Sequence, residues 1–265
     1  MTLGLFDPAF LGGLAAGGGG YDTDAQAYIT AVEAADGQPL EVGVQDAINA
    51  FFVGCKSDGI FSALKASCIL AGARTLSGAL VPLVSTMPAP TNGGGNFQAG
   101  DYNRKTGLVG NGSTTYLNSN RNNNDDPQNS NHNAVYATTV GTALAIHGGI
   151  LGTAGSNQIG LSARKSRNNN AILGIDMENG FAGINRANGV DFTYRTGGVN
   201  TVALQTSETP SNGNVVIGAG LTSPTTATGY GTHRLAFYSI GESVNLALLD
   251  ARVSTLMSDL AAAIP

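Results

Sequence analysis

The stretch Ala134-Val-Tyr-Ala-Thr-Thr-Val140 is rich in β-branched and aromatic residues, which favour strands and point to the fold class. A similar stretch, Arg234-Leu-Ala-Phe-Tyr-Ser-Ile240, lies nearer the C-terminus. Clusters of Gly, Asn and Ser separate such runs at intervals typical of β-sandwiches. No helix-length pattern lies between them, so we expect an antiparallel sandwich over residues 97–241 and no parallel βαβ fold. The other strand candidates are 114–117, 158–162, 171–175, 190–194, 200–204 and 214–217.

Helical patterns flank this β region. In residues 22–84, Asp22 or Asp24 can cap a first helix that Gly37 ends. Apolar stripes over 40–55 and 60–69 predict two more helices, and hence a small helical assembly module. Residues 242–265 carry a wide apolar stripe that predicts a C-terminal helix. The predicted fold class is mainly β with α: an N-terminal helical bundle, an antiparallel β-sandwich and a C-terminal helix.

Two further segments stand apart by composition. Residues 1–21 form a predicted flexible arm, in which Phe6 and Phe10 precede Gly17–Gly20, and four glycines do not favour a regular element. The alternative is an apolar arm that docks on a neighbouring subunit, with the glycines as a hinge. Residues 85–96 combine prolines with a run of three glycines and predict a linker.

Charge and cysteine content exclude several classes of protein. Only 12% of residues are charged and the net charge is −5, which argues against a nucleic-acid binder. No stretch approaches the ~20 apolar residues of a membrane-spanning helix. Cys55 and Cys68 lie among apolar residues and are expected to be buried thiols. The first six residues lack a basic segment, so we expect synthesis in a reducing cytoplasm without a signal peptide.

Two groups of motifs carry a resemblance to known proteins. The helical motifs Ala27-Tyr-Ile-Thr-Ala-Val-Glu-Ala-Ala-Asp-Gly37, Asp46-Ala-Ile-Asn-Ala-Phe51 and Cys55-Lys-Ser-Asp-Gly-Ile-Phe61 resemble a module of bacteriophage and prophage virion proteins. The motifs Gly110–Asn120, Asn133–Tyr136, Gly180–Arg186, Tyr194–Gly198 and Arg234–Gly241 are similar to the concanavalin A-like (laminin-G-like) jelly roll that phages place after that module. The resemblance implies a virion structural protein, assembled in the host cytoplasm and released by lysis.

Catalytic chemistry finds little support in the sequence. The nearest match to the Glu-x-Asp-x-(x)-Glu motif of glucanases is Gly174-Ile-Asp176-Met-Glu178, in which Gly174 replaces the nucleophile. His132, His147 and His233 are far apart and show no zinc-ligand spacing. We therefore expect no catalytic residue, no metal site and no cofactor.

The most unusual segment is the amide-rich run Asn118–Asn133. Amides and carboxylates supply the donors and acceptors that sugar hydroxyls need, which makes Asn122, Asn124, Asp125 and Asp126 candidate ligand-binding residues. Two alternatives stay open. Asp125 and Asp126 with nearby amide oxygens could hold Ca²⁺, or the run is a long polar loop that only contacts solvent.

The expected function is that of a non-enzymatic virion protein: a tail fibre or tail-associated adhesin whose outward jelly roll binds host-surface glycan during attachment. A capsid decoration protein is the alternative, and a glycan-degrading enzyme is less favoured. The expected partners are other virion proteins, contacted through the arm and the helical module, in a homotrimer. We also expect a host-surface polysaccharide as a ligand, and neither nucleic acid nor membrane. A surface of Asn, Ser and Thr with sparse charge suits subunits that pack closely.

Overall fold

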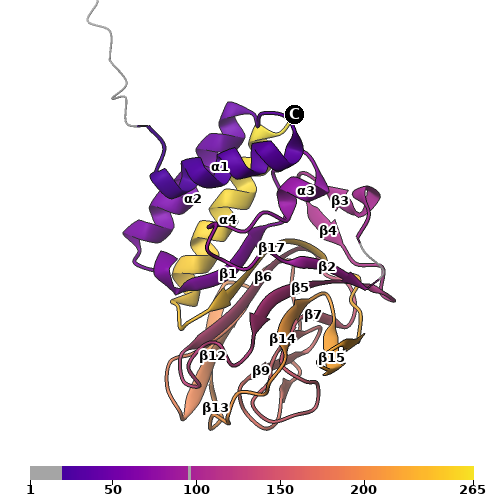
Figure 1. The fold of residues 1–265 in the computed structure, drawn as a ribbon. Helices are drawn as coiled ribbons and strands as arrows, with labels where there is room; N and C mark the ends of the chain where they lie inside the picture. Colours follow the sequence, from indigo (N-terminus) through magenta and orange to yellow (C-terminus); the bar gives the residue numbers. More distant parts are fainter. Residues whose placement is uncertain (1–19, 95–96) are drawn as a thin grey trace, which may run out of the picture.

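The computed structural model describes residues 20–94 and 97–265, which form a β-sandwich with a layer of helices on one face (Figure 1). The predicted fold class is confirmed. Sheet A runs in the order β13 (Val199–Leu204), β12 (Asp191–Thr196), β11 (Gly180–Arg186), β6 (Asn131–Thr139), β17 (Arg234–Gly241), β4 (Gly107–Val109) and β3 (Tyr102–Asn103), and β1 (Leu64–Ile69) also pairs with β17. Sheet B runs in the order β10 (Ile172–Leu173), β9 (Ala163–Ser166), β8 (Asn157–Gly160), β7 (Leu144–Gly148), β14 (Asn214–Ile217), β5 (Thr115–Asn122) and β2 (Thr91–Gly94). The paired strands of both sheets are antiparallel.

The helical layer consists of α1 (Thr23–Asp36), α2 (Val42–Ser57) and α4 (Leu246–Ala263), with the short α3 (Leu76–Ala79) beside it. Local signals set the ends of α1 as expected: the Asp22 carboxylate accepts from the backbone N–H groups of Asp24 and Ala25, and Gly37 follows the helix at φ 69°. The predicted C-terminal helix is also confirmed. Asn245 caps its start, so it begins a few residues later than the apolar stripe indicated.

The layer packs on the outer face of sheet A through a mainly apolar core. Phe51 of α2 meets Phe237 of β17 edge to face, with ring centroids 5.9 Å apart. A second core fills the space between the two sheets and includes Ile146, Ile184 and Tyr238. The helices therefore share a core with the sandwich and do not form a bundle with a core of its own.

The prediction of a third helix over 60–69 is wrong. A short 3₁₀ turn (Phe61–Ala63) leads into strand β1, which pairs with β17. Ala66 and Cys68 point into the sandwich core, whereas Leu64 and Ile69 belong to the core under the helices. β1 is buried along most of its length, and the periodicity of a buried strand does not distinguish it from a buried helix.

The stretch 85–96, expected as a linker, contains strand β2. Thr91–Gly94 pair with Thr115–Asn118 of β5, so this part of the stretch is the edge of sheet B. The expected arm lies almost entirely in residues 1–19, outside the described residues.

Candidate functional site

The amide turn, residues 122–130, carries the strand β5 of sheet B over to β6 of sheet A. Its own side chains shape it: Asn122 Oδ1 accepts from the Asn124 N–H at 3.1 Å, and Asp125 Oδ2 accepts from the Asn122 N–H at 2.8 Å. Asn and Asp favour turns because their short side chains bond to nearby backbone groups. The local sequence is thus suited to a tight turn at this position.

A buried ion pair supports the turn from below. Asp126 is only 4% exposed, and its carboxylate accepts two hydrogen bonds from the Arg121 guanidinium. Arg121 Nη2 lies 2.5 Å from Asp126 Oδ1, and Nε lies 3.1 Å from Oδ2. Such a fork fixes orientation as well as charge. Asp126 therefore holds the turn in place, which differs from its expected role as a ligand-contacting residue.

Arg167, which directly follows β9 of sheet B, holds the same turn. Its guanidinium, fully buried, donates to the carbonyl oxygens of Asn123, Asp126 and Pro127. Burial lowers the pKa of Arg167 to about 10, which is still far enough above neutrality to keep the group charged. Three carbonyls of one turn are thereby bound by a single rigid cation.

Asn123 ties the turn to two other loops. Its amide Nδ2 donates to the carbonyl oxygens of Gly155 at 2.9 Å and Ser211 at 3.1 Å. Its Oδ1 accepts from Asn157 Nδ2 at 2.9 Å. The side chain is buried, so these bonds exchange little with water and contribute to a defined turn conformation.

The solvent side of the turn is a surface of oriented amides, which we call the amide rim. Asn122 Nδ2 donates to Asn212 Oδ1 at 2.7 Å. The Ser207 hydroxyl accepts from Gln128 Nε2 at 2.9 Å and donates to Asn129 Oδ1 at 2.6 Å. The rim comprises Asn122, Asn124, Asp125, Gln128, Asn129, Ser207 and Asn212.

The candidate residues thus divide into two groups. Asn124 and Asp125 are exposed and Asn122 is half-buried on the rim, while Asp126 lies beneath it. Sequence reasoning missed Ser207 and Asn212, although a run of Ser, Thr and Asn between two strand candidates marked their loop as polar. Neutral amides held by a buried scaffold are suited to hydrogen bonds with hydroxyl groups.

A calcium site gains no support from the geometry. Asp126 is engaged by Arg121, so it does not join Asp125 in a pair of free carboxylates. Within residues 20–94 and 97–265, no three side chains of His, Cys, Asp or Glu come close enough together to hold a metal ion.

The histidines are buried at separate places. His132 Nδ1 lies 2.5 Å from the Glu242 carbonyl oxygen, and Nε2 lies 2.8 Å from the Ser239 hydroxyl. Burial lowers the pKa of His132 and of His147 to about 4. Burial also lowers the pKa of His233, whose Nδ1 accepts from the Gly141 N–H at 2.9 Å. Each ring is therefore neutral at pH 7, in line with a structural role.

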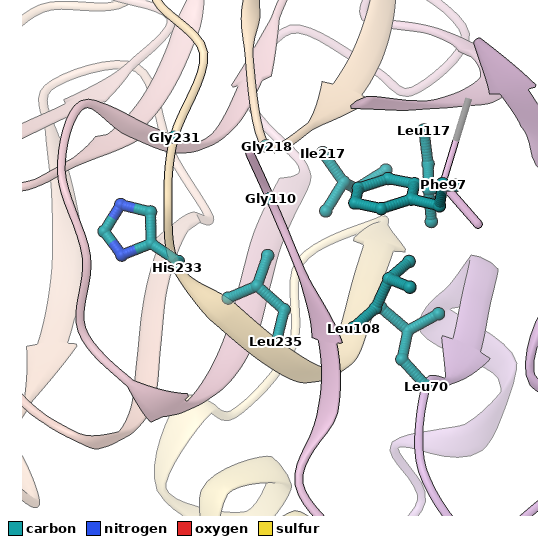
Figure 2. Close-up of a pocket in the computed structure, with 10 residues that line it drawn as sticks. All are labelled: Leu70, Phe97, Leu108, Gly110, Leu117, Ile217, Gly218, Gly231, His233 and Leu235. Carbon is teal, nitrogen blue, oxygen red and sulfur yellow. The ribbon is translucent and has the colours of Figure 1, made fainter. Parts of the chain in front are cut away.

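The carboxylates and cysteines noted in the sequence lie at separate places in the fold. Asp176 and Glu178 are exposed in the segment after β10. Burial raises the pKa of Cys55 and of Cys68 to about 12, so both thiols stay protonated, as expected. A small cavity of about 10 Å³ lies beside β17, and Figure 2 shows the residues that line it, whose side chains are apolar apart from His233. This volume is close to the minimum for one water molecule, so the cavity is a packing gap of the core.

Comparison with known proteins gives few relatives. No family model matches the sequence, and no curated protein sequence matches it either. Among solved structures, domain 4 of AbnA, a GH43 extracellular arabinanase from Geobacillus stearothermophilus in complex with arabinotriose, aligns with 71% of this chain and 97% of its own, at 11% identity and a TM-score of 0.43. A mutant of Trypanosoma rangeli sialidase displaying trans-sialidase activity aligns with 83% of this chain and 40% of its own, at 12% identity and a TM-score of 0.43. At these scores the likeness carries no functional argument.

Among the described residues, no helix has the length and apolarity required to cross a bilayer.

Proposed function

We propose that this chain is a non-enzymatic structural protein of a phage virion, a tail fibre or tail-associated adhesin that binds host-surface glycan through the amide rim. The observation that supports glycan binding is that the turn beneath the amide rim is held in a defined conformation. Arg167, Asn123 and the Arg121–Asp126 pair hold the backbone of the turn from inside, so the turn loses little conformational freedom on binding a ligand.

The amide rim is suited to uncharged polyols. Asp125 is the one charged residue among its seven members. Amide groups donate and accept at once, as sugar hydroxyls do. The virion part of the proposal rests on the resemblance of the motifs to phage proteins. It includes a homotrimer in which the helical layer contacts neighbouring virion proteins.

A glycan array with the purified protein tests the binding proposal. The triple variant Asn124→Ala, Asn129→Ala and Asn212→Ala is expected to lose binding. A matched control, Gln26→Ala with Gln38→Ala, removes two exposed amides of the helical region and is expected to bind as the native protein does. Equal binding by native protein and triple variant, or no glycan bound by the native protein, would contradict the proposal.

One observation favours the alternative, a capsid decoration protein. Strand β13 stands at the end of sheet A and has no charged residue; Val199, Val202 and Leu204 are 62%, 60% and 81% exposed. An uncharged apolar strand edge suits close packing between subunits. Antibody labelling of phage particles in the electron microscope separates the two roles: label on the tail supports adhesion, label on the head supports decoration, and label on neither contradicts both.

A further inference from the structure

A groove formed by two hollows begins on the exposed side of α1 and continues past Val84 over the segment around Met87. Its first part, a hollow of about 260 Å³, lies between one face of α1 and the segment after α3. Its second part, about 340 Å³, lies on the other side of Val84, which lines both parts. We call the two hollows together the arm groove. Its lining includes Ala27, Tyr28, Ala31, Val81, Val84 and Met87.

The walls of the groove leave apolar side chains in contact with water. Ala27 and Ala31 are exposed, and Val81, Val84 and Met87 are half-buried. In the first hollow these side chains form an apolar surface, which is typical of a contact with another segment or partner. The second hollow is partly polar, because Ser62, Lys65, Thr86 and Arg121 also line it. No segment within residues 20–94 and 97–265 covers the arm groove.

The position of the chain end identifies an occupant. The described chain begins at Gly20, and Asp24, four residues later, already lines the first hollow. The described chain therefore starts close to the groove. Nineteen residues span at most about 60 Å when extended. Ala27 and Ala31, which line the first hollow, are about 6 Å apart along the helix axis, so the segment is long enough to reach along this hollow.

The composition of that segment complements the groove. Residues 5–14 read Leu-Phe-Asp-Pro-Ala-Phe-Leu-Gly-Gly-Leu. Two phenylalanines and three leucines provide apolar side chains for the hollows. Asp7 is the one charged side chain in residues 1–20, and the second hollow contains Lys65 and Arg121. Lys65 has three donors, of which the ion pair with Glu242 at 3.1 Å uses one.

We propose that residues 5–14 of this chain dock in the arm groove of the same molecule, with Gly17–Gly20 as the hinge. This interaction surface is separate from the amide rim, and the proposal stands or falls independently of glycan binding. The glycines suit the hinge because they reverse the chain direction at little steric cost.

The absence of tryptophan from the sequence makes a direct test simple. In the full-length variant Phe10→Trp, the single indole reports the environment of the arm. Docking predicts a blue-shifted emission and weak quenching by acrylamide. Adding Ala31→Arg places a charge in the groove at an exposed helix position, and it is expected to shift the emission red and increase the quenching several-fold. The matched control Ala34→Arg, also exposed on α1 but outside the groove lining, is expected to change neither.

Three outcomes overturn the proposal. One is a solvent-like emission in Phe10→Trp itself, and another is an emission that Ala31→Arg leaves unchanged while circular dichroism shows a folded protein. The third is an emission that shifts red on dilution, because the arm would then occupy a second copy. An emission that is blue-shifted and independent of concentration supports docking within one molecule.

Discussion

The two cores of this protein differ in what they bury. The core under the helices holds mainly apolar side chains, including Phe51, Phe52 and Phe237. The space between the sheets is apolar in its middle, but Arg164, Arg167 and Arg186 are among its largest fully buried neighbours. Arg186 donates to the carbonyl oxygens of Ser166, Asn188, Asp191 and Gln205, and its guanidinium lies 5.6 Å from the centre of the Phe192 ring.

Apolar side chains and buried arginines stabilise the two cores in different ways. Apolar burial is strong and non-directional, so it attaches the helical layer to sheet A without fixing any loop. Buried arginines contribute less net stability, because desolvation offsets much of their attraction. Their rigid donors instead fix particular carbonyls, and the amide turn is held in this way. We therefore expect damage to the first core to be global and damage to the second to be local.

The largest effect is expected for Phe237→Ala in the apolar core. Phe237 is fully buried and contacts Phe51, so its truncation leaves a cavity and should lower the free energy of unfolding by about 3–5 kcal/mol. Denaturant unfolding measures the loss. The control Val202→Ala removes an exposed side chain and should change stability by less than about 0.5 kcal/mol. A Phe237→Ala variant as stable as the control would refute the assignment of this core.

Acidification should lower the free energy of unfolding. The pKa of His132 and of His147 is about 4 in the folded chain and about 6.5 when unfolded, so the unfolded state binds more protons between these values. The stabilisation is complete above about pH 6.5 and declines as the pH falls towards 4, by about 3 kcal/mol for each histidine. Glu41, whose pKa Arg104 lowers to about 2, contributes to acid sensitivity mainly below its ordinary pKa of 4.5.

Urea midpoints measured from pH 7 to pH 4.5 test this expectation. His132→Gln and His147→Gln should each reduce the slope by a similar amount, and His233, whose pKa burial also lowers, contributes to the slope that remains. A flat profile in the native protein would show that neither histidine is held neutral by burial.

A smaller and local effect is expected for Arg167→Met. The substitution leaves the carbonyls of Asn123, Asp126 and Pro127 without their donor, at a cost of about 2–3 kcal/mol after relief of the buried charge. Amide hydrogen exchange should increase over residues 122–130 and stay unchanged in α2. Arg74→Met is the control, because its partly exposed pair with Glu41 is worth at most about 1 kcal/mol. Faster exchange throughout the chain would contradict the local role of Arg167.

The smallest effect on stability is expected for Asn124→Ala on the amide rim. Its exposed side chain should contribute less than about 0.5 kcal/mol to folding. The same substitution should weaken glycan binding, which isothermal calorimetry with a glycan selected from the array measures. A loss of stability without a loss of affinity would assign Asn124 to the scaffold and not to the binding surface.

Features determined by neighbours in sequence were predictable. The cap at Asp22 and the left-handed Gly37 act within a few residues of α1, and Gly- and Asn-rich turns marked each of the eight predicted strands. The candidate site was predicted in part for the same reason. Asn122, Asn124 and Asp125 lie on a turn that their own side chains shape.

What depends on distant residues was decided by the tertiary structure. Residues 64–69 read equally as helix or strand until β17, about 170 positions later, supplies the backbone partners that make them β1. Asp126 is a buried support and not a ligand contact because Arg121 pairs with its carboxylate and Arg167 donates to its carbonyl oxygen. Local propensity acts over a few residues, whereas burial and hydrogen-bond satisfaction depend on which distant segments the fold brings together.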